Sequence, residues 1–159
     1  MARTVPMGFS DLPTIYNLSA PVGPGMPNSM DDVLLVQALM KIANFTRFTA
    51  ALGPVEASRD IKVDGIFGPQ TKRMIKAFEA DRISARLLLV ADGVFEPSHD
   101  DGFTKSGVLF KIIHLNRMAK NADDFGNDYN ALPFSPDTHP VLRNSLIKGA
   151  RPPQPSSGF

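Results

Sequence analysis

The sequence predicts a mainly α-helical chain, a small bundle of three helices with extended segments at both ends. Three observations lead to this fold class. Apolar side chains recur at intervals of three and four residues in three stretches, as in helices with one buried face. Residues 63–69 return later in the chain as residues 91–97, and both copies contain an Asp-Gly pair. Prolines are frequent in residues 1–28 and 149–159, where they disfavour helix.

The first helix is expected to begin after Ser29, a favourable N-cap residue. Asp31 and Asp32 follow in the first turn, where carboxylates face the positive end of the helix dipole. The predicted buried stripe consists of Val36, Leu39, Met40 and Ala43. The pattern fades over residues 45–48, and the Gly-Pro pair at 53–54 ends any continuation.

The second helix is expected to begin at Pro69, because the N–H that proline lacks would have no partner in the first turn. Gly65, in the preceding turn, can adopt a positive φ at little cost. The apolar stripe of this helix consists of Thr71, Met74, Ile75 and Phe78. Its opposite side carries Lys72, Arg73 and Lys76.

A third helix is predicted over residues 104–118, with Val108, Ile112 and Leu115 on one face. A short further helix is predicted over residues 138–147, with Pro140 in its first turn.

These elements predict four segments. Residues 1–28 form a proline-rich extended arm, and residues 29–120 form the helical domain. Residues 121–148 add a loop and a short helix packed on the domain, and residues 149–159 form a flexible tail. The arm carries apolar side chains, so we expect it to lie against the domain or a partner. They are Phe9, Leu12, Ile15, Tyr16 and Leu18.

The internal repeat predicts a duplicated unit in which a turn leads into a helix. In each copy the Asp-Gly pair bends the chain. The residues that follow, Ile66 and Phe67 or Val94 and Phe95, are expected to anchor the turn to the core. A leading helix and two such units would form one pseudo-symmetric bundle.

Composition argues against several classes of partner and location. The 159 residues carry a net charge of only +1, which gives no electrostatic basis for binding nucleic acid. The longest apolar run, residues 87–91, is too short to insert across a membrane. The first ten residues lack the apolar core of a signal peptide. We therefore expect synthesis in the bacterial cytoplasm, with any delivery beyond it by lysis or a secretion machine.

No recognisable pattern predicts a metal site or a cofactor. The chain has no cysteine, and its three histidines, His99, His114 and His139, do not share metal-binding spacing. His99 precedes two aspartates, a pattern that is typical of a polar loop. The acidic stretch 123–128 has its glycine too early for a calcium loop, so a turn is expected.

Catalysis is not predicted either. The sequence contains no nucleophile elbow and no Ser-x-x-Lys motif. Its only glutamates are Glu56, Glu79 and Glu96, and a bundle this small offers little wall for a sugar cleft. Without tryptophan, only Tyr16 and Tyr129 combine a stacking face with a polar edge for a saccharide. We expect a protein that is not an enzyme.

Residues 64–71, Asp-Gly-Ile-Phe-Gly-Pro-Gln-Thr, followed by Ala77 and Phe78, resemble the D-G-x-F-G-P-x-T…A-x-x-F-Q signature of peptidoglycan-binding-like domains. Val33, Val36, Gln37 and Met40 resemble the first helix of that family, and residues 92–94 resemble its closing turn. The three segments agree in order over about 90 residues. Residues 19–33 are more loosely similar to the start of such domains in phage-like and type VI secretion-related proteins.

The chain departs from this pattern at three places. Glu79 replaces the usual Gln after Phe78, and Glu96 replaces the second glycine of the closing turn. The segments 49–62 and 97–103 are long. These changes lie where the resemblance places the family's ligand groove, so the fold carries over better than the binding.

The resemblance implies a non-catalytic cell-wall module that recognises the stem peptide or glycan of peptidoglycan. Backbone N–H groups at the first turn and helix start would meet an anionic or amide-rich ligand, and Arg73 could bind a carboxylate. The candidate ligand-binding residues are Asp64, Phe67, Gln70, Thr71, Arg73 and Asp92. A purely structural interpretation remains open: a turn and helix start, a core Phe67, and a solvated basic face.

A second function remains open as well. The chain could be a structural or adaptor subunit of a phage-tail-like or type VI secretion-type assembly that keeps the fold without wall binding. The apolar arm and the proline-rich tail motivate this interpretation, because ordered arms are favoured when a partner buries them. An inhibitor of a wall hydrolase is a third option, with no residue pattern behind it.

Overall fold

The computed structural model describes residues 1–44, 46–49, 53–57, 60–87, 89–99, 101–105, 107–123 and 127–149. Within them the fold is mainly α. The helices are α1 (Met30–Ala43), α2 (Pro69–Ser84), α3 (Lys111–Ala122), α4 (Asn127–Asn130) and α5 (Pro140–Gly149). The strands are β1 (Arg3–Pro6), β2 (Thr14–Asn17), β3 (Thr46–Thr49) and β4 (Gly53–Ala57). They form two separate antiparallel pairs, β1 with β2 and β3 with β4.

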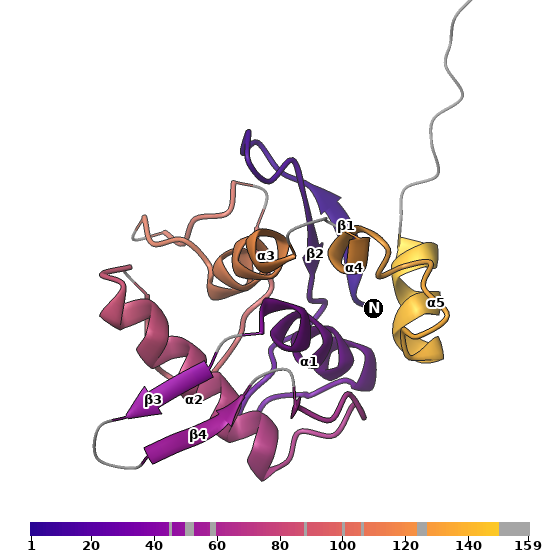
Figure 1. Cartoon of the computed structure of the whole chain (residues 1–159). Helices are drawn as coiled ribbons and strands as arrows, with labels where there is room; N and C mark the ends of the chain where they lie inside the picture. Colours follow the sequence, from indigo (N-terminus) through magenta and orange to yellow (C-terminus); the bar gives the residue numbers. More distant parts are fainter. Residues whose placement is uncertain are drawn as a thin grey trace, which may run out of the picture.

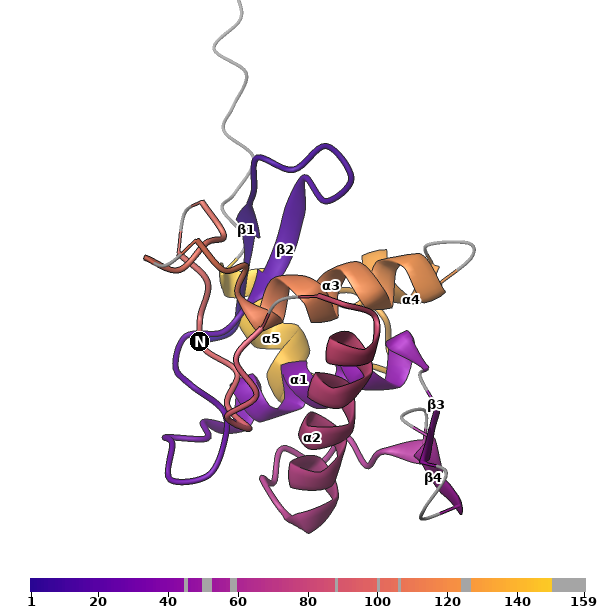
Figure 2. The same cartoon turned by 90° about the vertical axis from the view of Figure 1, so that its left-hand side faces the viewer.

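Helix α1 is the central element, and α3 and α5 pack against it (Figures 1 and 2). Every side chain from Asp32 to Met40 is buried. The predicted stripe is therefore buried, but burial extends around the whole helix, as expected for the run Val33-Leu34-Leu35-Val36. Any polar side chain in this part of α1 must consequently find its hydrogen-bond partners inside the protein.

Helix α2 begins at Pro69, which occupies the predicted position in the first helical turn. Its predicted stripe, Thr71, Met74, Ile75 and Phe78, is buried. The Phe78 ring lies 5.3 Å from the ring of Phe95, which follows the second Asp-Gly pair. The second turn is thus packed directly against α2.

Residues 1–28 contain a β-hairpin rather than a simple extended arm. Strands β1 and β2 pair with Val5 opposite Ile15. The hairpin covers the helices, with β1 on α5 and β2 on α3 (Figure 1). Leu12, Ile15 and Leu18 are at most 1% exposed. The apolar residues of this segment are therefore buried against their own chain.

Two carboxylates in the first turn of α1 bind the N-terminal segment. Asp31 accepts a hydrogen bond from the Ala2 amide at 2.6 Å. Asp32 is fully buried and accepts hydrogen bonds from the amide and hydroxyl of Ser19 and from the amide of Ala20. Burial raises the pKa of Asp32 above its usual value. Ser29 occupies the N-cap position, but its side chain makes no capping hydrogen bond.

The third helix begins later than the sequence predicts, at Lys111 instead of Thr104. Gly107 has a φ of +81°, and its amide donates to the Thr104 carbonyl, while the Thr104 amide donates to the Val108 carbonyl. This tight turn is incompatible with a continuous α-helix. Val108 therefore does not share a helical face with Ile112 and Leu115, and the predicted boundary was wrong.

A simple three-helix bundle is not confirmed. The sequence did not predict α4 or the β3–β4 pair, in which Thr46 lies opposite Ala57. Helix α5 begins at Pro140, close to the predicted start. Residues 150–159 of the predicted tail and residues 124–126 of the acidic stretch lie outside the described residues. Within the described residues, no helix combines the length and apolarity needed to span a bilayer.

The burial of the hairpin predicts that Leu12→Ala lowers the free energy of unfolding by about 2–4 kcal/mol, because it leaves a cavity in the core. Ile147→Ala, at an apolar position that is 47% exposed, is the control and should change it by less than about 0.5 kcal/mol. Urea denaturation measures both. Equal, small effects would show that the hairpin does not contribute to the core.

Candidate functional site

The first Asp-Gly turn is held by a buried side chain of α1, Gln37. Its Oε1 accepts hydrogen bonds from the amides of Asp64 and Gly65 at 3.1 and 2.9 Å. Its Nε2 lies within hydrogen-bonding distance of Asp64 Oδ1 and Thr71 Oγ1, at 3.1 and 3.0 Å, and also of the Ile66 carbonyl. One amide side chain therefore joins α1, the turn and the start of α2.

Glycine is required in this turn for two reasons. Gly65 has a φ of +76°, a backbone angle that residues with a side chain rarely adopt. A Cβ atom at this position would lie 2.7 Å from Cγ of Met30. Asp64 completes the turn by accepting a hydrogen bond from the Ile66 amide, and this bond lowers the pKa of Asp64.

The second Asp-Gly turn is held in the same manner by Glu79 of α2. Both carboxylate oxygens of Glu79 accept a hydrogen bond from the Gly93 amide, at 3.1 and 3.0 Å. Asp92 accepts from the Val94 amide, as Asp64 does from Ile66. Gly93 has the same φ of +76° as Gly65. The repeat in the sequence is thus a repeat in hydrogen bonding.

The second turn differs from the first in its charge. Lys111, at the start of α3, donates to Glu79 at 2.8 Å and to Asp92. Lys111 and Glu79 are 8% and 4% exposed, whereas the Asp92 side chain is 47% exposed. Burial raises the pKa of Asp92, but the hydrogen bonds from Lys111 and Val94 outweigh it, and the pKa lies below its usual value. In the second turn, the carboxylate of Glu79, paired with Lys111, therefore has the position that the neutral amide of Gln37 has in the first turn. We call Glu79, Lys111 and Asp92 the buried ion group.

The structure separates the candidate ligand-binding residues into two groups. Asp64 and Thr71 meet at Gln37, and Gln70 accepts a hydrogen bond from the Lys62 amide at 3.0 Å. Phe67 is half-buried against the core, and Arg73 lies on the exposed side of α2. Asp92 belongs to the second turn with Lys111. The polar groups of Asp64, Gln70, Thr71 and Asp92 all have partners within the protein.

Two further expectations need correction. Ile66 does not anchor the first turn, because its side chain is 65% exposed, whereas Val94, Phe95 and Phe67 are buried or half-buried. Tyr16 and Tyr129 are 6% and 4% exposed and pack on each other at 5.0 Å, so neither presents a face to a saccharide.

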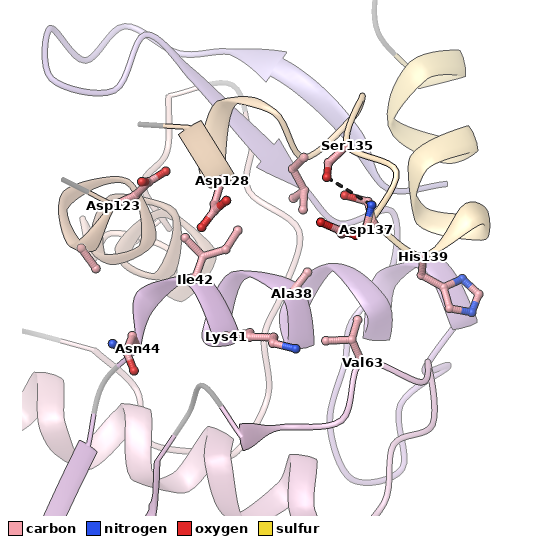
Figure 3. A pocket seen from close by; sticks show the side chains of 13 residues that line it. Ala38, Lys41, Ile42, Asn44, Val63, Asp123, Asp128, Ser135, Asp137 and His139 are labelled. Carbon is pink, nitrogen blue, oxygen red and sulfur yellow. Dashed lines mark hydrogen bonds between the residues drawn. The ribbon is translucent and has the colours of Figure 1, made fainter. Parts of the chain in front are cut away.

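A pocket beside α1 contains none of the candidate residues. Figure 3 shows this pocket, which has a volume of about 760 Å³ and which we call the α1 pocket. It is lined by Ala38, Lys41, Ile42, Asn44, Val63, Ala122, Asp123, Asp128, Leu132, Ser135, Asp137, Thr138 and His139. Its apolar part comes mainly from α1, and its carboxylates come from the ends of α3 and α4 and the loop before α5.

Sequence reasoning missed both Lys111 and the α1 pocket. A signal existed for Lys111, since a lysine between Phe110 and Ile112 in an apolar run requires a buried partner. The pocket carboxylates follow no motif, because Asp123, Asp128 and Asp137 meet only through the packing of separate segments.

The histidines lie apart. His99 packs edge-on against Phe110 at 5.2 Å, and its neighbour Asp100 lies outside the described residues. The His139 Nδ1 accepts a hydrogen bond from the Val141 amide. His114 is buried, and its Nε2 has no hydrogen-bond partner in the described structure. Across the described ranges, no three acidic or histidine side chains are grouped to hold a metal ion.

Comparison with known proteins gives no match to any family model, to any curated protein or to any solved structure. Membership of the peptidoglycan-binding-like family therefore remains a prediction.

The buried ion group predicts that Lys111→Met lowers the free energy of unfolding by about 3–5 kcal/mol, because Glu79 loses its buried counter-ion. The double variant Lys111→Met/Glu79→Gln should recover part of this loss, because no buried carboxylate is then left without a cation. Urea denaturation of the two single variants and the double variant measures the coupling. Strictly additive effects would contradict it.

Burial, followed by the charges of Arg117 and Arg82, lowers the pKa of His114 to about 4. Below the unfolded value of about 6.5 the unfolded chain binds a proton that the folded chain does not. Stability therefore falls as the pH drops from 7 to 4.5, and His114→Phe should reduce this fall by about 1–2 kcal/mol. Urea denaturation at both pH values measures it, with His139→Gln as the control. An unchanged pH dependence in His114→Phe would contradict the expectation.

Proposed function

We propose that this chain is a non-catalytic module that binds bacterial peptidoglycan. The observation that carries the proposal is the duplicated turn, in which Gln37 and Glu79 hold the two Asp-Gly pairs through the backbone amide of the glycine. The residues that suggested the family in the sequence are thus the residues that build these turns. The two segments that match the signature thus share one structural plan in this protein, which supports the proposal.

The α1 pocket provides room for a wall fragment. Its volume of about 760 Å³ is in the range of pockets that bind small ligands. It combines an apolar part, which includes Ile42 and Leu132, with polar groups at several points. A stem peptide, which has aliphatic, amide and charged parts, matches such a lining.

The carboxyl groups whose pKa is shifted give no support to acid catalysis. A general acid at neutral pH needs a raised pKa. Asp64 and Asp92 are shifted in the opposite direction, as in groups that stabilise turns. Asp32 has a raised pKa but is fully buried under the N-terminal segment, where no substrate reaches it.

The alternative proposal, a structural or adaptor subunit, has lost its main support. It was motivated by the apolar N-terminal segment and the proline-rich tail. Leu12, Ile15 and Leu18 are buried in their own domain, and residues 150–159 of the tail lie outside the described residues. Wall binding therefore remains the better-supported function.

Co-sedimentation with insoluble peptidoglycan sacculi tests the proposal. We expect the protein in the pellet at low salt, where charge contacts are strongest, with less bound at high salt. Protein that stays in the supernatant at low salt contradicts wall binding. Removal of residues 1–28 is not a useful test of the adaptor alternative, because it would open the core around Leu12.

The candidate residue Arg73 can be tested in the same assay. If its guanidinium holds a stem-peptide carboxylate, Arg73→Gln should reduce the bound fraction severalfold. Lys72→Gln removes the same charge from the neighbouring exposed position and serves as the control. Equal binding by the two variants would remove Arg73 from the site without affecting the proposal as a whole.

A further inference from the structure

The α1 pocket lies mostly outside the segments that carry the family resemblance. Its lining comes from the second half of α1, the end of α3, α4 and residues 132–139 before α5, together with Val63, the first residue of the repeated segment 63–69. The polar groups that could recognise a ligand there come mainly from residues 123–139.

Negative charge dominates this pocket. Three carboxylates line it, those of Asp123, Asp128 and Asp137, against the single ammonium group of Lys41. Asp123 accepts a hydrogen bond from the Tyr129 amide at 2.9 Å. Asp128 and Asp137 are exposed, and their carboxylates have no ion-pair partner among the described residues. Figure 3 shows these two carboxylates on one side of α1 and Lys41 on the other. The side of the pocket with Asp128 and Asp137 thus favours a cation, and the side with Lys41 favours an anion.

Thr138 offers a hydrogen-bonding group to a ligand. This residue lines the pocket and is only 8% exposed, and its hydroxyl makes no hydrogen bond within the described structure. The hydroxyl is not one of the enclosed polar atoms without a partner, so it reaches the open space of the pocket. A ligand carbonyl or amide in the pocket can therefore bond to it.

The remaining lining is apolar and suits an aliphatic chain. Ala38, Ile42 and Val63 contribute from one side, and Leu132, which is 5% exposed, contributes from another. Burial of several methylene groups there contributes about 0.8 kcal/mol for each group. The occupant should therefore carry its positive charge at the end of an aliphatic stem.

We propose that the α1 pocket binds a short peptide through a residue with a primary ammonium group on an aliphatic stem. The ammonium lies between Asp128 and Asp137, and the stem packs on Ile42 and Leu132. A peptide carbonyl accepts from the Thr138 hydroxyl, and a terminal carboxylate lies on the Lys41 side. The inference rests on the proposed function only for the source of this peptide, the diamino acid of a wall stem peptide.

The experiment uses the full chain and two synthetic probes, acetyl-Ala-Ala-Lys and the same peptide with an acetylated lysine side chain. The second probe keeps the stem and removes only the charge. Titration followed by ¹H–¹⁵N NMR gives the Kd and shows which amides shift. We expect the lysine peptide to shift amides around Asp128, Asp137 and Thr138, and to bind at least about fivefold more tightly than the acetylated peptide.

Two variants locate the interaction. Asp128→Asn/Asp137→Asn should weaken binding of the lysine peptide by at least about fivefold. Glu96→Gln/Asp101→Asn removes the same charge from exposed positions outside the pocket and should leave the Kd unchanged. Thr138→Val should weaken both probes to the same degree, because its hydroxyl contacts the peptide backbone in each. Thermal unfolding confirms that the variants remain folded.

The inference is overturned if neither probe binds, if both bind equally, or if the two double variants weaken binding alike. These outcomes are independent of the sacculus assay. Sedimentation with sacculi but no lysine-peptide binding would leave the proposed function standing and remove this pocket from it. Lysine-selective binding without sedimentation would support the pocket and direct attention to a lysine side chain of a protein as the source.

Discussion

The structure depends on the burial of α1 on all sides from Asp32 to Met40. This part of the helix cannot direct polar side chains to water, so each polar side chain there must be satisfied by another segment. Asp32 does so by binding residues 19–20, and Gln37 does so by binding the first Asp-Gly turn. These two side chains therefore determine where the N-terminal segment and the start of α2 lie. The apolar packing around α1 stabilises the fold, and the hydrogen bonds of its buried polar side chains determine where the neighbouring segments lie.

The second turn uses the same plan with a different chemistry. Gln37 can both accept and donate, so the first turn needs no further group. Glu79 can only accept, and its negative charge requires Lys111 from the next helix. The replacement of an amide by a carboxylate thus links α2 to α3 through a buried ion pair. Glu79, which stands where the signature has Gln, is thus neutralised inside the protein by Lys111. This ion pair also occupies polar groups that could otherwise have bound a ligand.

Neighbouring parts of α1 contribute to different features. Around Gln37, the polar groups of the first turn are bonded to one another, including those of Asp64 and Thr71. Around Ala38, Lys41 and Ile42, the segments that close over the helix leave a pocket. The resemblance directs attention to the turns, whereas the carboxylates of Asp128 and Asp137, which have no ion pair among the described residues, line the pocket.

The sequence by itself determined the start of α1 and of α2, the two bends at Gly65 and Gly93, and most of the core of α2. These features follow from local rules: acidic residues in a first turn, proline at a first helical position, positive φ and helical spacing act over a few residues. Tertiary structure alone decided that residues 3–17 form a hairpin on the helices, that Lys111 neutralises Glu79, and that three separate aspartates share one pocket. Such contacts join residues far apart in the chain, and no local pattern encodes them.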